Sequence, residues 1–304
     1  QTRLDGLGSH ARRRIQVEGP GLRSWNATAM SELPLFVQAV LLGLVQGLTE
    51  FLPVSSSAHL VLLPTLGGGQ YFGKSFDVAL HGGTLVALLV AMPEEARAFV
   101  RMLAGLLRGR FRPQDPLERL TLLALFGSLP AALVGLALET RVEDLLHGVP
   151  LLALTLAGFG VLMAVVDQRS PRHRELFTCD LREALLVGLA QALATVPGVS
   201  RSGATMTAAR ALGLSRSEAA RLSFLFAFPV LGGATLLKAL RGFELPTPEF
   251  IGPLAAGVAA AALSGTLGLR LLRRHLQDGS FLPFAWYRIV LGAGLLLWVG
   301  QKAL

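Results

Sequence analysis

A short polar segment, FLPVSSSAHL at 51–60, interrupts a stretch of otherwise apolar, helix-forming sequence. Gln46 and Glu50 precede this segment and are four residues apart, so they share one face of the helix that leads into it. Pro53 disfavours helical backbone at Leu52 and so ends that helix. Ionisable side chains at membrane depth are costly and usually functional, which makes Glu50 a candidate for chemistry.

Three serines follow the proline, Ser55, Ser56 and Ser57, and serine is a natural N-cap for a second helix. His59 lies three residues after Ser56, so the two side chains can share a helix face. A serine becomes a nucleophile when a base takes its proton, and His59 could do so. Glu50 could orient His59, accept a proton or bind a divalent metal. The structural alternative is that the serines cap a helix while Glu50 and His59 make ordinary hydrogen bonds.

A second polar segment, PGVSRSGAT at 197–205, is broken by a Pro-Gly pair. Ser200 or Ser202 can cap a new helix there, and the free N–H groups of a helix N-terminus favour phosphate. Arg201 can bind phosphate oxygens in a bidentate way, and the Thr205 hydroxyl can face the same site. The alternative for Arg201 is a snorkelling or helix-capping role.

If the two segments meet, two helix N-termini converge with Arg201, Ser56, His59 and Glu50. Such a site would bind a phosphate-like anion. Arg201 and the N–H groups would offset the charge that develops on phosphoryl oxygens during hydrolysis. The sequence therefore predicts phosphoryl-transfer chemistry, and it leaves open whether Ser56 or water attacks phosphorus.

Long apolar helices must position these segments. The chain has 304 residues, of which 52% are hydrophobic and 16% charged, well below the quarter that is usual for soluble domains. Apolar blocks of about 20 residues, the length that crosses a bilayer, predict an all-α polytopic membrane protein rather than a soluble bundle. We expect spans at about 76–92, 120–138, 150–166, 219–240, 250–270 and 284–303. Asp77 and His81 would form a hydrogen-bonded pair on one face, and Trp286 and Tyr287 an interfacial aromatic belt.

The two polar segments belong to an internal repeat. GLVQGLTEFLPVSSS at 43–57 aligns with GLAQALATVPGVSRS at 188–202, with a constant offset of 145 residues. Broken helices in corresponding positions of two halves are typical of duplicated membrane proteins. We expect one membrane domain over 30–304, with repeats at about 31–166 and 184–304.

Lysine and arginine are distributed unevenly among the loops. Six lie in 93–119 and four in 167–183, whereas 65–75 and 139–149 hold one each. Loops rich in Lys and Arg alternate with loops poor in them across the membrane only if each interrupted segment enters and leaves on the same side of the membrane. Each such segment would then be a re-entrant helix pair. The positive-inside rule then puts the loop at 93–119 in the cytoplasm. Each half has one re-entrant pair and three spans, so we expect inverted topology with the two tips meeting near the midplane.

Residues 1–29 are polar and carry five arginines against Asp5 and Glu18. We interpret them as an extension outside the fold, disordered or foreign to the natural protein. The net charge of +8 is interpreted as basic cytoplasmic loops rather than nucleic-acid binding, because no basic patch with interleaved aromatics occurs. The single cysteine, Cys179, excludes an internal disulfide framework and a multi-cysteine metal site.

At these motifs the sequence resembles the undecaprenyl-diphosphate phosphatase family of bacterial inner-membrane enzymes. QGLTEFLPVSSSAH and PGVSRSGAT resemble its two motifs, and the likeness runs over nearly the whole chain from Met30, including FLPFAWYR near the C-terminus. The resemblance implies dephosphorylation of undecaprenyl diphosphate to the monophosphate. That reaction recycles the lipid carrier of cell-wall synthesis and is linked to bacitracin resistance. The resemblance also implies an inverted-repeat fold and a site facing the periplasm.

The resemblance implies residue roles as well. We expect the catalytic residues to be Ser56, His59, Glu50 and Arg201. We expect the substrate-binding residues to be Gln46, Ser55, Ser200, Ser202 and Thr205. The family is described as needing a divalent cation, Mg²⁺ or Ca²⁺. Since Gln46 is the amide variant of a family glutamate, only Glu50 is an obvious acidic ligand here.

Two other functions use similar features. A polyprenyl-phosphate transporter or flippase would use the same anion site, but the serine–histidine–arginine set favours chemistry because transport needs no nucleophile. A phosphatase of the type-2 phosphatidate-phosphatase family would carry a histidine downstream of Arg201 where Thr207 stands, and we reject it. The expected partners are a polyprenyl diphosphate lipid and membrane lipids, without nucleic acid. A homodimer is left open.

Overall fold

The fold is helical throughout the part of the chain that the structure, a computed structural model, describes. Within that part no strand occurs, and one isolated bridge joins Arg174 to Leu214. Five described helices are long and apolar enough to cross a membrane, and a bent helix pair makes a sixth candidate. The expected all-α polytopic membrane protein is confirmed. The expectation for 1–29 lies outside the described residues, which are 30, 32–68, 72–110, 112–138, 148–171, 174–242 and 248–303.

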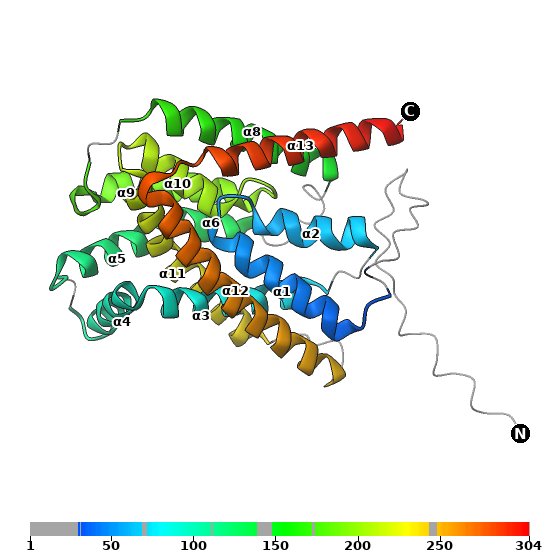
Figure 1. Cartoon of the computed structure of the whole chain (residues 1–304). Coiled ribbons are helices and arrows are strands. Elements are labelled where there is room, and N and C mark those ends of the chain that lie inside the picture. The colour runs from blue at the N-terminus through cyan, green and yellow to red at the C-terminus, as the bar shows by residue number, and fades with distance from the viewer. Residues whose placement is uncertain are drawn as a thin grey trace, which may run out of the picture.

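Each half begins with a broken helix pair and continues with three longer apolar segments (Figure 1). The described α-helices of the first half are α1 (Leu35–Phe51), α2 (Ser56–Gly67), α3 (Lys74–Ala91), α4 (Pro93–Leu107), α5 (Pro116–Gly127), α6 (Leu129–Leu138) and α8 (Val149–Arg169). Those of the second half are α9 (Leu181–Ala192), α10 (Arg201–Ala211), α11 (Arg216–Arg241), α12 (Ile251–Asp278) and α13 (Leu282–Ala303). The six expected spans correspond to α3, α5 with α6, α8, α11, α12 and α13.

Helix α4 was not expected, because it lies in the charged segment 93–119, which was predicted to be a loop. Pro93 occupies the first helical position, and Glu94 and Glu95 lie in the first turn, where acidic side chains favour a helix N-terminus. The chain bends by 106° between Ser75–Ala91 and Pro93–Leu107. The basic residues of 93–119 indicated a loop, whereas α4 buries one side that includes Ala98 and Met102.

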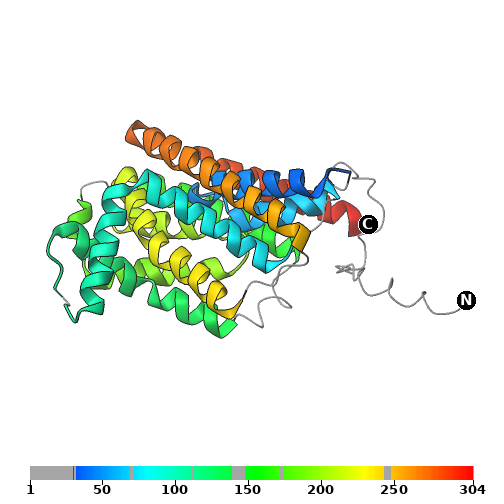
Figure 2. The ribbon, with the colours of Figure 1, turned by 90° about the horizontal axis from the view of Figure 1, so that it is seen from below.

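The two halves pack against each other in a repeated pattern (Figures 1 and 2). Helix α1 lies along α12, and its counterpart α9 lies along α5 and α6. The last helices of the two halves, α8 and α13, run side by side. Glycines allow the closest crossings: a Cβ on Gly43 would clash with the carbonyl oxygen of Gly257, and one on Gly188 with that of Gly127. Since Gly43 and Gly188 are equivalent in the repeat, the same type of close helix crossing occurs once in each half. Membrane sidedness, and with it the inverted topology, stays a prediction from loop charge.

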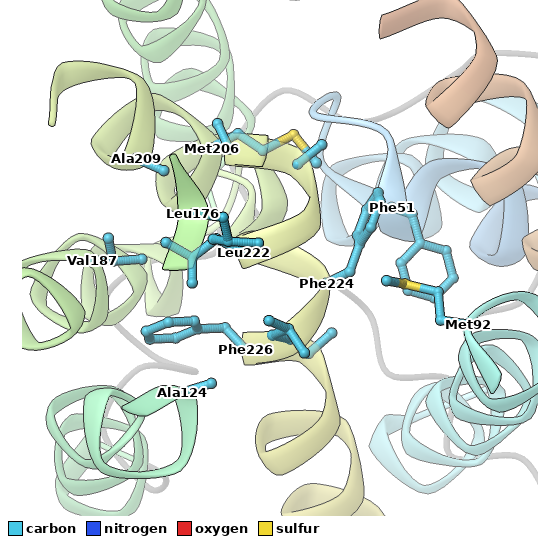
Figure 3. Close-up of a cluster of buried hydrophobic side chains, with 14 of the residues drawn as sticks. Phe51, Met92, Ala124, Leu176, Val187, Met206, Ala209, Leu222, Phe224 and Phe226 are labelled. Carbon is cyan, nitrogen blue, oxygen red and sulfur yellow. The ribbon is translucent and has the colours of Figure 1, made fainter. Parts of the chain in front are cut away.

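Several helices carry exposed apolar side chains outside a buried hydrophobic core. Leu133, Leu263 and Leu297 are 67%, 74% and 70% exposed, as expected of side chains that face lipid. The core includes Phe224 and further side chains of α11 (Figure 3). The Phe224 ring meets Phe51 edge to face, with 6.0 Å between centroids. The core is therefore in direct contact with the end of the first broken helix.

Asp167, near the end of α8, ties several helices together. It is fully buried and accepts hydrogen bonds from the side chains of Arg210 and Arg216 and from the backbone N–H of Phe281. A buried carboxylate is tolerated when it is paired in this way. The ends of α8 and α10 and the starts of α11 and α13 are thus fixed relative to one another.

We expect Gly43→Ala and Gly188→Ala each to destabilise the protein by about 1–3 kcal/mol, because the added methyl group must push the facing helix away. The measurement is the apparent melting temperature in detergent. The matched control is Gly158→Ala in α8, where an added Cβ meets nothing within 4 Å. If all three variants melted alike, the close crossings would be contradicted.

Candidate active site

The two helix breaks lie against each other. The Ser202 hydroxyl donates to the carbonyl oxygen of Leu52 over 3.0 Å, and Nη2 of Arg201 donates to Oε1 of Glu50 over 2.6 Å. Leu52 is the extended residue that ends α1. Its carbonyl oxygen accepts this hydrogen bond from Ser202 of the second repeat. Residues about 150 positions apart in the sequence therefore form one polar cluster.

The same strained turn occurs at both breaks. Ser55 and Ser200 have φ angles of 75° and 73°, and they are the non-glycine residues with positive φ in the described ranges. This left-handed region disfavours residues with a side chain, and such strain is found mostly at functional sites. The Ser200 hydroxyl accepts from the N–H of Gly203 and caps α10. The turns place Ser56 and Arg201, which are equivalent in the repeat, at the first positions of α2 and α10.

Glu50 is the centre of the cluster. It is 6% exposed, and its Oε1 accepts from Arg201. Its Oε2 accepts from the Ser56 hydroxyl over 2.8 Å and from Nε2 of Gln46 over 2.9 Å. Nε2 of His81, on α3, lies 3.6 Å from the same oxygen. Hydrogen bonds from several donors, one of them charged, offset the cost of burying this carboxylate.

His59 has partners other than Ser56. Its Nδ1 lies 2.7 Å from the carbonyl oxygen of Ser55, and since a carbonyl only accepts, Nδ1 carries the proton. Its Nε2 lies 2.6 Å from the hydroxyl of Tyr287, and the two rings stack with 5.7 Å between centroids. The group placed to accept the Ser56 proton is therefore Glu50. Tyr287, expected in an aromatic belt, is also the partner of His59.

Thr205 does not face the cluster. Its hydroxyl is buried and lies 2.6 Å from the Ser223 hydroxyl of α11, and it also donates to the carbonyl of Arg201. The side chain therefore holds α10 against α11. Its effect on the site is through the placement of Arg201.

Two buried polar atoms of the cluster have no hydrogen-bond partner among the described residues: Nη1 of Arg201 and Oε1 of Gln46. The guanidinium nitrogen is a donor that suits a phosphate oxygen, and the amide oxygen is an acceptor. Buried groups of this kind are rarely left unpaired, so both point to a ligand.

The cluster offers few of the ligands that a divalent cation prefers. In the described part of the chain no group of three His, Cys, Asp or Glu side chains lies close enough to bind a metal. Glu50 supplies the carboxylate of the cluster, and three side chains already donate to it. Mg²⁺ is often bound by one or two carboxylates together with substrate phosphates. Glu50 and Oε1 of Gln46 therefore fit a cation that arrives with a phosphate ligand.

Cys179, which precedes α9, offers no nucleophile. Its side chain is buried, and burial raises the pKa of the thiol to about 11. The thiolate is the reactive form, so this cysteine is inert at neutral pH.

Arg288, which was not among the expected site residues, is 1% exposed in α13 and donates to carbonyls of both breaks. The available signal was a lone charged residue in an apolar stretch, the same signal that identified Glu50. The approach of His81 to Glu50 had no comparable signal, because it depends on how α3 packs against α1.

Fold and cluster together define an integral membrane protein built on a duplicated broken helix pair, with serine, glutamate and arginine at the junction. The family described as bacitracin resistance protein BacA matches residues 39–294. Proteins named undecaprenyl-diphosphatase from Geobacter sulfurreducens and Geobacter metallireducens are 45% and 44% identical over 266 residues, covering 86% of this chain and 98% of each relative. One from Trichlorobacter lovleyi is 41% identical over 270 residues, covering 87% and 97%. The chain belongs to the BacA family, which confirms the resemblance inferred from the two motifs.

Proposed function

We propose that this protein is a membrane phosphatase that hydrolyses undecaprenyl diphosphate to undecaprenyl phosphate and inorganic phosphate. Its similarity to proteins named undecaprenyl-diphosphatase supports the proposal. The observation that carries it is the junction of Ser56, Glu50 and Arg201, with the carboxylate 2.8 Å from the hydroxyl and 2.6 Å from the guanidinium. Phosphoryl transfer uses a nucleophile, a proton acceptor and a positive group, and transport would need no nucleophile.

In the proposed reaction the terminal phosphoryl group lies at the N-termini of α2 and α10. Glu50 accepts the proton of Ser56 while Oγ bonds to the terminal phosphorus. The bond from that phosphorus to the bridging oxygen breaks, and undecaprenyl phosphate leaves. Water then attacks the phosphoserine, Glu50 returns to Oγ the proton that it took from Ser56, and both protons of the water stay with the inorganic phosphate, which leaves as H₂PO₄⁻. In the alternative, water attacks directly with Glu50 as base and Ser56 holds the phosphoryl group.

The remaining polar residues would bind the diphosphate. Nη1 of Arg201 lacks a partner among the described residues and can donate to a phosphoryl oxygen while Nη2 contacts Glu50. Ser55, Ser200 and Ser202 hold the turns whose free N–H groups face the anion. Gln46 orients the carboxylate through its amide. These donors are fixed before the substrate arrives, which favours stabilisation of the developing charge.

The proposal includes a divalent cation, Mg²⁺ or Ca²⁺, that arrives with the diphosphate. Glu50 and Gln46 would hold it, and it would neutralise charge on the phosphoryl oxygens. We place the multi-pass protein in the bacterial inner membrane, and we place its site facing the periplasm, as the family resemblance implies. There its product would return to the lipid-carrier cycle of cell-wall synthesis, and its activity would confer bacitracin resistance.

We expect the purified chain to release inorganic phosphate from undecaprenyl diphosphate when assayed with Mg²⁺, with Ca²⁺ and with a chelator. Arg201→Ala should lower turnover by about 100-fold or more, because it removes the main positive group at the phosphate. The control is Arg274→Ala, which changes an exposed arginine of α12 and should retain activity. Absence of phosphate release under every metal condition, or a wild-type rate for Arg201→Ala, would contradict the proposal.

We expect Ser56→Ala to abolish turnover and acid-quenched wild-type protein to carry phosphate on the Ser56 peptide, as measured by mass spectrometry. The matched control is Ser57→Ala, because Ser57 is an exposed neighbour that bonds to Ser55 rather than to Glu50. Substantial turnover by Ser56→Ala, with no phosphoserine in the wild type, would instead assign the attack to water.

A further inference from the structure

Arg288 is a buried cation whose described partners are backbone carbonyls. It lies on α13, is 1% exposed and ranks among the largest fully buried side chains. In the described part of the chain no carboxylate forms an ion pair with it, in contrast to Arg201 with Glu50 and Arg210 with Asp167. Burying a charge is costly unless its donors are satisfied, so the position of this side chain needs a reason.

The guanidinium of Arg288 bridges the two helix breaks. Nη1 donates to the carbonyl of Pro53 in the first break over 3.3 Å. Nη2 donates to the carbonyls of Gly198 and Val199 in the second break, over 2.9 and 2.8 Å. Nε donates to the carbonyl of Leu156 on α8 over 3.4 Å. Carbonyls at a break lack intrahelical donors, and at membrane depth they must be satisfied by other groups.

The neighbouring backbone is shaped to admit this side chain. A Cβ on Gly203, in the first turn of α10, would lie 2.6 Å from Nη1 of Arg288. A planar guanidinium offers five donors in a fixed fork, which suits several carbonyls at once, whereas a lysine ammonium has no such fork. Both the residue type and the space around it therefore match a bridge between the breaks.

The bridge lies close to the reacting groups along both chain segments. Pro53 is three residues before Ser56, and Val199 is two residues before Arg201. We propose that Arg288 is a positioning residue that holds the two breaks in register so that Ser56 and Arg201 both reach Glu50. Its effect on turnover rests on the proposed phosphatase function, whereas its effect on the backbone of the two breaks does not.

The test that is independent of activity is hydrogen–deuterium exchange followed by mass spectrometry. In Arg288→Gln, peptides covering both breaks, 52–57 and 197–203, should exchange faster together. The control is Arg210→Gln, another fully buried arginine of the second half, which contacts Asp167 and carbonyls away from the first break. It should leave the first break unchanged. Faster exchange in only one break of Arg288→Gln, or in neither, would overturn the proposal even if the protein were no phosphatase.

The kinetic test compares kcat and KM for undecaprenyl diphosphate. Arg288→Gln should lower kcat by about 100-fold with KM changed only a few-fold, because small misplacement of reacting groups is costly in rate. Arg288→Lys should recover part of the loss. The fold-loss of kcat caused by Arg201→Ala should be much smaller in the Arg288→Gln background than in the wild type. In the Arg210→Gln background that fold-loss should be as large as in the wild type. An equal fold-loss of kcat in all three backgrounds would contradict a positioning role for Arg288.

Gly203→Ala provides a second variant that keeps the arginine and fills the space beside Nη1. It should lower kcat and speed exchange in both breaks in the same way as Arg288→Gln. If Arg288→Gln fails to fold, this variant decides the question, and a Gly203→Ala protein with wild-type kcat and exchange would overturn the proposal.

Discussion

The buried ion pair between Glu50 and Arg201 is the contact on which the arrangement of the site depends. It joins the end of α1 to the start of α10, so it exists only when the two halves of the chain are packed together. A buried pair is weak support for stability, because the desolvation of both charges opposes their attraction. The pair instead provides specificity. Burying either the carboxylate or the guanidinium without its partner would be strongly unfavourable, so the two breaks are held in one relative position. Close helix crossings at Gly43 and Gly188 pack α1 against α12 and α9 against α5, on either side of that contact.

Duplication explains how one site arises from two similar segments. The repeat places Ser56 and Arg201 at equivalent positions, each just after a serine in the left-handed region. Glu50 corresponds to Thr195, so the second copy lacks the carboxylate and one copy alone has only half of the chemistry. The same backbone turn thus presents a hydroxyl in one half and a guanidinium in the other. Glu50 accepts hydrogen bonds from both, which makes the cluster asymmetric although its backbone is repeated.

Much of this could be predicted because local pattern and membrane physics agree. Apolar length indicated the long helices, Pro53 and the Pro-Gly pair indicated the breaks, and an ionisable Glu50 in apolar sequence indicated the site. The partners could not be predicted where they depend on tertiary packing. Spacing suggested that His59 faces Ser56, but the strained turn at Ser55 and the approach of Tyr287, which is 228 residues away, direct the ring elsewhere.

The central claim, that Glu50 and Arg201 are paired across the two breaks, is tested most directly by a double-mutant cycle of thermal stability without substrate. The proteins are the wild type, Glu50→Gln, Arg201→Gln and the double variant. Each single variant leaves a buried charge without its partner, a change that costs about 3–5 kcal/mol in buried pairs. The account predicts that the melting temperature of the double variant falls by clearly less than the sum of the two single losses. Additive losses would contradict it, because they would mean that the two side chains do not interact in the folded protein.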